Sequence, residues 1–209
     1  MSLIFLKEIK KQLGSHEPED VDKLILDNLF NKLRILSEDH KLSLEKYTSL
    51  KHLSLNNIGL SCLKNFPKLP SLKILELREN LLTGEDLNLL SELCPNILKL
   101  KLGCNPIKNI DYLDTFNCSD IKIIELYDTP LSYTKQYKEI LFYKIRALEI
   151  IDSHDRDGYT VSSDLSDEEE SYESSESESN NKGSNNKSKE NNKKNNKNYS
   201  FDNSINVSL

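Results

Sequence analysis

One pattern of eleven residues occurs twice in this chain of 209 residues, at residues 72–82 and again 25 residues later at residues 97–107. In both copies leucine or isoleucine occupies positions one, four, six and eleven, and asparagine occupies position nine. Apolar residues two apart predict a short strand with one buried side. Such a unit cannot enclose a core alone, so the chain is expected to stack several units against each other.

Three partial copies extend this pattern in both directions. The units begin at residues 21, 50, 72, 97 and 121, which gives spacings of 29, 22, 25 and 24 residues. Thr129 takes the asparagine position of the fifth unit, whereas Asn28 and Asn57 stand one place early in the first and second units. The pattern is the L-x-x-L-x-L-x-x-N-x-L signature of leucine-rich repeats, whose usual period is roughly 20–29 residues.

The repeats predict an α/β fold: a right-handed leucine-rich repeat solenoid of five units with a concave parallel sheet and a cap at each end. A helix is expected over residues 3–13, with Ser2 as N-cap, Gly14 as stop and an apolar stripe of Leu3, Ile4, Leu6, Ile9 and Leu13. A closing helix is expected from the spacing of Tyr137, Leu141, Phe142, Ile145 and Leu148, followed by a last strand at Ile150 and Ile151.

Composition divides the chain near residue 163. Residues 1–163, the predicted repeat domain, hold 24 acidic and 22 basic side chains. Residues 164–179 hold eight acids and no base, and residues 180–198 hold six lysines, one glutamate and many asparagines. The acidic tract (164–179) and the Asn/Lys-rich tail (180–209) have too little apolar surface to offset the entropy of ordering, so both are expected to be disordered. The acids of the tract are Asp164, Asp167, Glu168, Glu169, Glu170, Glu173, Glu176 and Glu178.

No pattern indicates catalysis, a cofactor or a metal ion. The four cysteines lack C-x-x-C pairing, which favours reduced thiols, and the four histidines lack ligand spacing. The run of Asp152, Asp155, Arg156 and Asp157 follows the predicted last strand, where such side chains cap backbone groups. We therefore expect a non-enzyme without a small-molecule substrate. A secretory signal is not expected, because charged residues interrupt the N-terminal apolar run after four residues, and no run approaches the roughly 18 residues of a membrane span.

The predicted binding surface is the concave side of the sheet. Side chains alternate across a strand, so positions three, five and seven of each unit should face that side. These positions hold Lys23, Ile25 and Asp27; His52, Ser54 and Asn56; Ile74, Glu76 and Arg78; Lys99, Lys101 and Gly103; and Ile123, Glu125 and Tyr127. The set predicts a mixed-charge surface for a protein partner with Tyr127 as an aromatic anchor.

Several segments resemble the acidic leucine-rich nuclear phosphoprotein 32 family. They are residues 24–28, 65–69 and 94–97 and the closing run from Tyr137 to Gly158, followed by the acidic tract. The resemblance covers about residues 15–160 and implies a monomeric nuclear protein that binds histones, inhibits a serine/threonine phosphatase of the 2A type and regulates chromatin and transcription. It also implies a protein that shuttles between nucleus and cytoplasm. We expect no direct contact with nucleic acid. The tract here is shorter than is usual in that family.

Related terminal caps occur in other leucine-rich proteins, including the spliceosomal A-prime subunit, so a structural role in a ribonucleoprotein is an alternative. The acidic tract favours histone binding, because carboxylates compete with DNA phosphate for lysine-rich proteins. Ser166 and Ser175 are followed by acids three residues on, a context that kinases of the casein-kinase-2 type prefer. Each phosphate would add about −1.5 to −2 charges at neutral pH.

Overall fold

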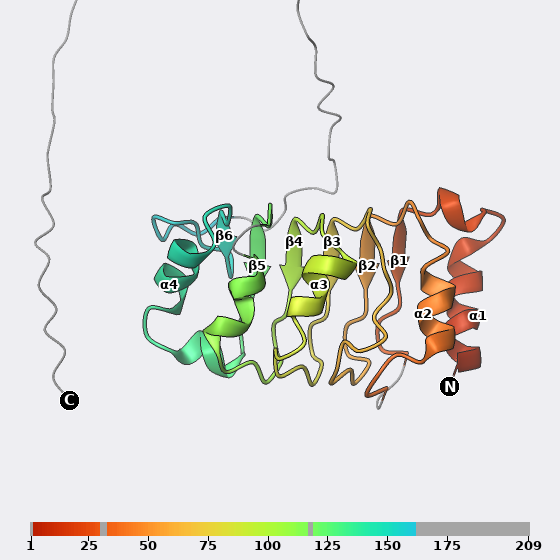
Figure 1. Ribbon diagram of the computed structural model, residues 1–209, viewed down its shortest axis with the longest axis horizontal. Helices are drawn as coiled ribbons and strands as arrows, with labels where there is room; N and C mark the ends of the chain where they lie inside the picture. The colour runs from red at the N-terminus through yellow and green to blue at the C-terminus, as the bar shows by residue number, and fades with distance from the viewer. Residues whose placement is uncertain (1, 30–32, 117–118, 162–209) are drawn as a thin grey trace, which may run out of the picture. The chain divides into compact units, whose positions relative to one another are not determined.

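A computed structural model describes residues 2–29, 33–116 and 119–161 of the chain (Figure 1). In this part the chain forms one parallel sheet of six strands that lie in sequence order. The strands are β1 (Lys23–Ile25), β2 (His52–Ser54), β3 (Ile74–Glu76), β4 (Lys99–Lys101), β5 (Ile123–Glu125) and β6 (Ile150–Ile151). Each unit contributes one strand, as the repeat predicts, and the closing segment contributes the sixth.

The apolar row at position four holds the sheet in register. Leu24 pairs with Leu53, and the row continues without a shift through the other strands to Ile151. The leucines two residues on form a second row, and both rows are fully buried. Each repeat therefore buries its apolar side against the units before and after it, which is why the units are stable only as a stack.

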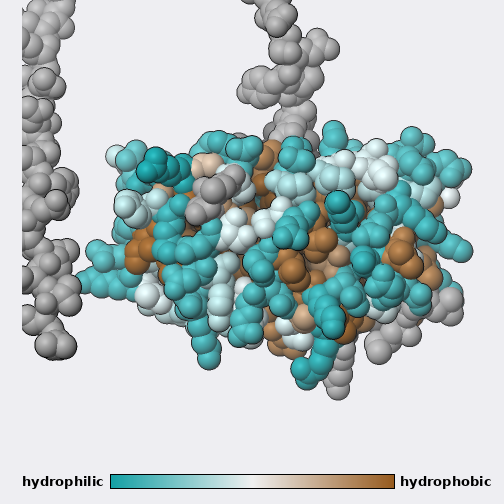
Figure 2. Space-filling model, viewed as in Figure 1, coloured by the Kyte–Doolittle hydropathy of each residue, from teal (hydrophilic) through white to brown (hydrophobic). Residues whose placement is uncertain are grey.

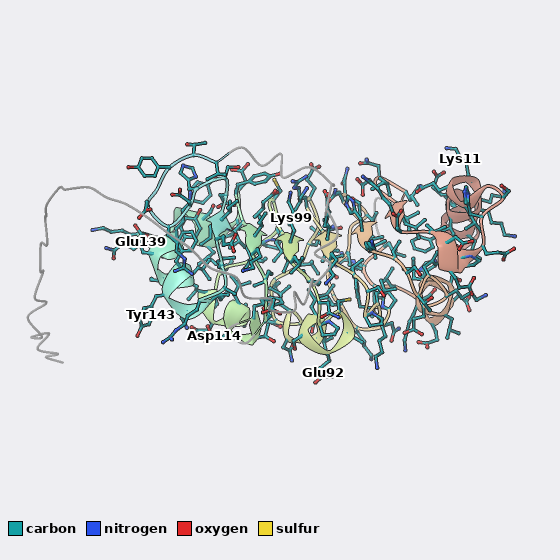
Figure 3. All side chains as sticks on the ribbon, turned by 90° about the horizontal axis from the view of Figure 1, so that it is seen from above. Lys11, Glu92, Lys99, Asp114, Glu139 and Tyr143 are labelled. Atoms are coloured by element: carbon teal, nitrogen blue, oxygen red, sulfur yellow. The ribbon has the colours of Figure 1, made fainter. Side chains whose placement is uncertain are left out.

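Helices and turns return the chain on the convex side. They are α2 (Glu38–Leu44), α3 (Asn88–Leu93), the 3₁₀ segments η2 (Ile110–Phe116) and η3 (Pro130–Tyr133), and α4 (Tyr137–Lys144). The helix α1 (Ser2–Leu13) and the 3₁₀ segment η1 (Pro18–Asp20) precede β1 at the N-terminal end of the stack. Figure 3 shows Glu92 of α3 and Asp114 of η2 on the side of the sheet opposite Lys99. Polar side chains cover most of the face seen in Figure 2, and apolar residues show between them in small areas. No helix of the described ranges has the length and apolar character needed to cross a bilayer.

The signature asparagines bind the turns that leave the strands. Asn80 is buried; its Nδ2 donates to three carbonyls, and its Oδ1 accepts from the amides of Ile58 and Leu60. One repeat later, Asn105 Nδ2 also donates to three carbonyls, and its Oδ1 accepts from Leu82 N at 3.0 Å. Each asparagine therefore ties its own turn to the preceding repeat.

The two asparagines that stand one place early in their repeats have a different structural role. Asn28 and Asn57 have φ of 58° and 52°, in the left-handed region, as do the equivalent residues of the later repeats, Glu79, Cys104 and Asp128. Position eight thus requires a left-handed residue, which asparagine tolerates well. Asn57 therefore does not replace a signature asparagine; position nine of its repeat is the buried Ile58.

The N-terminal cap is helical as predicted, but its buried side differs from the expected stripe. Ile4 is 55% exposed, whereas Phe5, which the predicted stripe omitted, is fully buried and lies 4.5 Å from the His40 ring. The helical phase runs through Phe5, Ile9 and Leu13, four residues apart, of which the first two are buried and Leu13 is partly buried. The Ser2 and Leu3 side chains lie outside the described atoms, and Gly14 (φ 60°) follows the helix.

A side chain closes one edge of the sheet and a backbone turn closes the other. At β1, Gln12 Oε1 accepts from Ile25 N at 2.9 Å and Gln12 Nε2 donates to Ile25 O, so the amide takes the place of a neighbouring strand. At the other end, Ile151 N donates to His154 O, which returns antiparallel beside β6. Both edges are thereby shielded from pairing with another chain.

The C-terminal cap is held by three charged side chains. The Arg156 guanidinium donates to the carbonyls of Phe142, Ile145, Arg146 and Leu148 and lies 5.1 Å from the Phe142 ring centroid. Asp152 Oδ1 accepts from Leu126 N and Tyr127 N, and its other oxygen accepts from Tyr137 OH. Asp155 accepts from the amides of Asp157 and Tyr159 within the final turn. These residues satisfy the backbone groups that the last repeat leaves unpaired.

Candidate protein-binding face

Three rows of side chains run across the concave face, one for each position predicted to point there. Strand register aligns Lys23, His52, Ile74, Lys99 and Ile123, and the sheet adds Ile150 at the end of this row. The row at position five is Ile25, Ser54, Glu76, Lys101 and Glu125. Asp27, Asn56, Arg78, Gly103 and Tyr127 follow at position seven, directly after these strands. We call this surface the concave face.

Its N-terminal part is a hydrogen-bonded chain that links β1 to β3. Asp27 accepts from Ser54 Oγ at 2.6 Å and from the Asn56 backbone N at 2.8 Å. Asn56 in turn accepts from Arg78 N at 2.7 Å and donates to Glu76 Oε2 at 3.3 Å. The short polar side chains of adjacent repeats therefore fix one another's positions.

Glu76 is the centre of the charged part. Its Oε1 lies 3.0 Å from both His52 Nε2 and Lys101 Nζ, and its Oε2 lies 3.3 Å from Arg78 Nη1. Arg78 also donates from Nε to Glu125 Oε2 at 2.8 Å, reaching past β4 to β5. Gly103, which has no side chain, occupies the intervening place in the position-seven row. The charged side chains around Glu76 therefore form a continuous network that joins β2, β3, β4 and β5.

These contacts shift the titration of two groups. Burial would raise the pKa of the Glu76 carboxyl, but hydrogen bonds from His52, Lys101 and Asn56 and the Lys101 charge outweigh burial and hold that pKa well below its usual range. Burial would lower the pKa of Arg78, yet the hydrogen bond and charge of Glu125 and the charge of Glu76 raise it. Both side chains are therefore ionised in the folded protein at neutral pH.

Removing the Glu76 charge should change the acid response of the protein. A carboxyl with a depressed pKa in the folded state adds stability above its unfolded pKa of about 4.3, and that contribution falls as the pH drops below it. We expect the difference in unfolding free energy between wild type and Glu76→Gln to shrink from pH 7 to pH 3 in urea titrations. Glu92→Gln, on the exposed side of α3, is the matched control. A difference that stays constant over this range would contradict the role given to Glu76.

An aromatic side chain borders the network at β5. The Tyr127 ring lies so close to Gly103 that a Cβ added there would be 2.7–3.0 Å from three ring carbons. Tyr127 N donates to Asp152, which fixes the backbone beneath the ring, and the residue remains 39% exposed. A tyrosine held in this way presents apolar area with little entropy to lose on binding.

The concave face is not acidic. It carries the cations Lys23, Arg78, Lys99 and Lys101 and the three carboxylates of Asp27, Glu76 and Glu125. Burial lowers the pKa of Lys99, and the neighbouring charges of Lys101 and Arg78 lower it further against the opposing effect of Glu125 and Glu76. Lys99 therefore lies close to charges of both signs.

Other predicted residues lie elsewhere. The acidic tract, Ser166 and Ser175 lie outside the described residues. Ile150 and Asp152 belong to a sixth unit of the stack, which the sequence predicted only as part of the C-terminal cap. The signal for this unit was Leu148, which stands three residues before Ile151 as Ile121 stands before Ile124.

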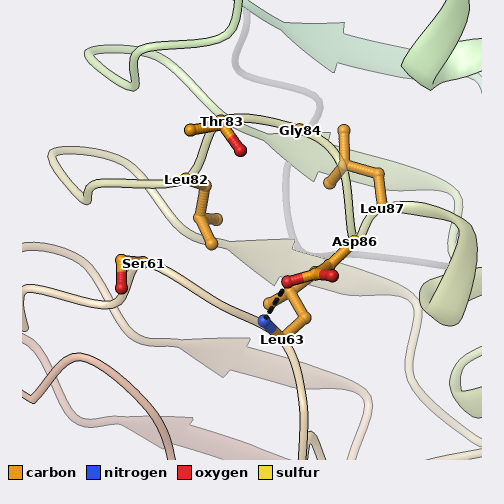
Figure 4. A pocket seen from close by; sticks show the side chains of 7 residues that line it. All are labelled: Ser61, Leu63, Leu82, Thr83, Gly84, Asp86 and Leu87. Atoms are coloured by element: carbon orange, nitrogen blue, oxygen red, sulfur yellow. Dashed lines mark hydrogen bonds between the residues drawn. The ribbon is translucent and has the colours of Figure 1, made fainter.

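Two hollows are lined by residues that do not belong to the concave face. The notch in Figure 4, lined by residues including Ser61, Thr83 and Asp86, is filled by its own side chains, and Asp86 accepts from Leu63 N at 3.2 Å. A second hollow of about 280 Å³ lies between Cys94 and Phe116. Within the described ranges, no three histidine, cysteine or acidic side chains are grouped so as to hold a metal ion.

Comparison with solved structures agrees with this architecture. A chain of the Drosophila melanogaster SNF/U2A' complex is similar over 75% of this chain and 84% of its own length, with 21% identity and a TM-score of 0.54. The fold is a leucine-rich repeat solenoid. A chain of the Chaetomium Mex67:Mtr2 subunits aligns over 72% of this chain and 92% of its own, with 13% identity and a TM-score of 0.43. No protein-family model matches the sequence.

Proposed function

We propose that this leucine-rich repeat protein is a nuclear protein-binding scaffold that captures basic proteins such as histones. The observation that supports a binding role is the concave face, whose side chains are fixed by a continuous network from Asp27 to Glu125. A surface that is ordered before binding loses little entropy when a partner arrives. Figure 3 shows that α3 and η2, marked by Glu92 and Asp114, lie on the side of the sheet opposite Lys99 and this face.

The acidic tract supplies the preference for basic partners. Eight carboxylates within residues 164–179 make a dense negative charge, whereas residues 1–163 are nearly balanced, with 24 acids and 22 bases. Long-range attraction to a lysine-rich protein should therefore come mainly from the tract. Screening reduces the reach of this field to about 8 Å at physiological ionic strength, so affinity should fall with added salt. Phosphate on Ser166 and Ser175 would strengthen the attraction.

Titration of histone dimers against the full chain tests this proposal. Replacing the eight acids by Asn or Gln should weaken binding by at least about tenfold at low salt, because the attraction is electrostatic. Truncation after residue 179 removes the lysine-rich segment and should preserve or raise affinity. The matched control is a variant with four exposed acids of the repeat domain neutralised. Equal affinity of the neutralised tract and the wild type at both low and physiological salt would contradict tract-driven capture.

A structural role in a ribonucleoprotein is the second candidate. It is favoured by the similarity of the fold to a chain of the SNF/U2A' complex. Purification of the tagged full chain from nuclear extract, with and without ribonuclease, separates the two functions. Histones retained after ribonuclease treatment support the first proposal, and recovery within an RNA-containing particle supports the second.

A further inference from the structure

Two tyrosine side chains are exposed where the chain leaves the fifth repeat. Tyr127 follows β5 and is 39% exposed, and Tyr133, the last residue of η3, is 78% exposed. Both are held in place: the Tyr127 ring packs on Gly103, and Tyr133 OH donates to Asp128 Oδ1 at 3.1 Å. Aromatic rings that are ordered in advance lose little entropy when a partner covers them.

Acidic side chains lie beside these rings. Position eight of the third, fourth and fifth repeats holds Glu79, Cys104 and Asp128, and backbone hydrogen bonds between successive turns align the three residues. Glu79 and Asp128 are both exposed. Burial raises the pKa of the Cys104 thiol, and the charges of Asp128 and Glu79 raise it further against the opposing charge of Arg78. Negative charge therefore predominates around the thiol.

We propose that Glu79, Tyr127, Asp128 and Tyr133, which together we call the aromatic rim, bind a lysine or arginine side chain of the basic partner. The proposal rests on the capture of basic proteins proposed above and adds a contact on the repeat domain to the attraction of the tract. A cation is attracted by carboxylates and also by the face of a tyrosine ring whose centroid lies within about 6 Å. An acidic segment would be repelled by the two carboxylates.

Asp128 can accept a further hydrogen bond. Its Oδ1 accepts from Tyr133 OH, and its Oδ2 lies 4.0 Å from Cys104 Sγ. An ionised carboxylate has about four acceptor sites, so about two remain for an ammonium or guanidinium group. A cation can therefore bind at Asp128 without breaking the bond that orients the Tyr133 ring.

Neighbouring cations limit the strength of this contact. Arg78 donates to Glu76 at 3.3 Å and to Glu125 at 2.8 Å, so its charge is largely directed to these two carboxylates. Lys108 and Lys135 are exposed in the segments that follow the fourth and fifth turns. Their flexible side chains can turn into solvent, but their charges still oppose an incoming lysine. Neutralising Lys135 should therefore strengthen binding.

The place where the tract begins favours one partner for both surfaces. Val161 N donates to Ser153 O at 2.8 Å, and Asp152, the residue before Ser153, accepts from Tyr127 N at 2.9 Å. Val161 is thereby anchored beside the fifth repeat, and Asp164, the first acid of the tract, follows three residues later in the sequence. The tract therefore starts at the end of the repeat domain that carries the aromatic rim.

The test uses the full chain and a synthetic peptide of alternating lysine and alanine. Binding is followed by the backbone amide resonances of the protein. We expect shifts at Glu79, at Cys104 and at residues 127–133. These shifts should persist, at weaker affinity, in a full chain whose eight tract acids are replaced by Asn or Gln.

Asparagine substitutions remove the two charges with little change to the turns. Asn28 and Asn57 occupy the same position in the first two repeats with the same left-handed backbone. The double variant Glu79→Asn and Asp128→Asn should therefore fold, and it should weaken peptide binding by about fivefold at low salt. Lys135→Gln should raise the affinity. Thermal melting checks that each variant is folded.

Tyrosine substitutions test the rings. Tyr133→Ala should weaken peptide binding by about threefold, and Tyr133→Phe, which keeps the ring but loses the hydroxyl, should restore most of the affinity. Tyr143→Ala is the matched control, because Tyr143 is 85% exposed on α4 and does not belong to the aromatic rim. It should have no effect on binding.

Three outcomes would overturn the proposal. They are equal effects of Tyr133→Ala and Tyr143→Ala, wild-type affinity of the double asparagine variant, and equal binding of the same peptide with glutamate in place of lysine. Failure here can be told apart from failure of histone capture by the tract. Rim variants that bind like wild type while the neutralised tract loses histone affinity would reject the rim alone. The control acids in the histone titration must therefore exclude Glu79 and Asp128.

Discussion

Phe142→Ala should lower the free energy of unfolding by about 3–5 kcal/mol, because it removes a large apolar side chain and leaves a cavity. The ring is only 8% exposed, on the inner side of α4, where it covers the end of the solenoid. The Arg156 guanidinium lies over the ring while it binds four backbone carbonyls, so loss of the ring also loosens the main support of the cap. A terminal repeat without its cap exposes apolar surface and opens first.

The neighbouring residue provides the control. Tyr143 is 85% exposed on the same helix, so Tyr143→Ala removes an aromatic side chain without removing buried contacts. Urea unfolding followed by circular dichroism should place this variant within about 0.5 kcal/mol of the wild type. If both variants were equally stable, Phe142 would not be part of the core and the cap would be wrongly assigned.

The repeat pattern predicted the fold because one physical requirement recurs in every unit. In every unit the residue at position four must pack in register against its equivalents on the neighbouring strands: Leu24, Leu53, Leu75, Leu100 and Ile124. This requirement is visible in the sequence as apolar residues that recur every 22–29 residues. Alternation along each strand also predicted which residues share the concave face. The N-terminal helix shows the limit of this reasoning. Its short sequence allowed a stripe through Ile4, and only packing against His40 decides that Phe5 is buried.

The interactions on the concave face could not be predicted in the same way. Arg78 and Glu125 are 47 residues apart and contact each other across an intervening strand. Their contact depends on the small Gly103 between them and on the long, flexible arginine side chain. The sequence predicted a surface of mixed charge, but it did not show that the Glu76 carboxylate would bind four groups, those of His52, Asn56, Arg78 and Lys101.

Asn80→Ala should lower the free energy of unfolding by about 3 kcal/mol, since several buried backbone groups lose their partners at once. The side chain donates to the carbonyls of Leu55, Leu77 and Arg78 and accepts from Ile58 N and Leu60 N. Alanine can replace none of these bonds. Asn80→Asp tests the donors separately, because an ionised carboxylate keeps the acceptors but has no hydrogen to give to the three carbonyls.

The local consequence is the more specific measurement. The amides of Ile58 and Leu60 are held by the Asn80 side chain, so their hydrogen exchange should accelerate in Asn80→Ala by more than global destabilisation accounts for. Asn96→Ala is the control, because Asn96 is exposed and donates one bond, to Pro70 O. Unchanged protection of both amides in Asn80→Ala would show that the asparagine does not join the second repeat to the third. The stack would then be held by the leucine rows and strand pairing alone.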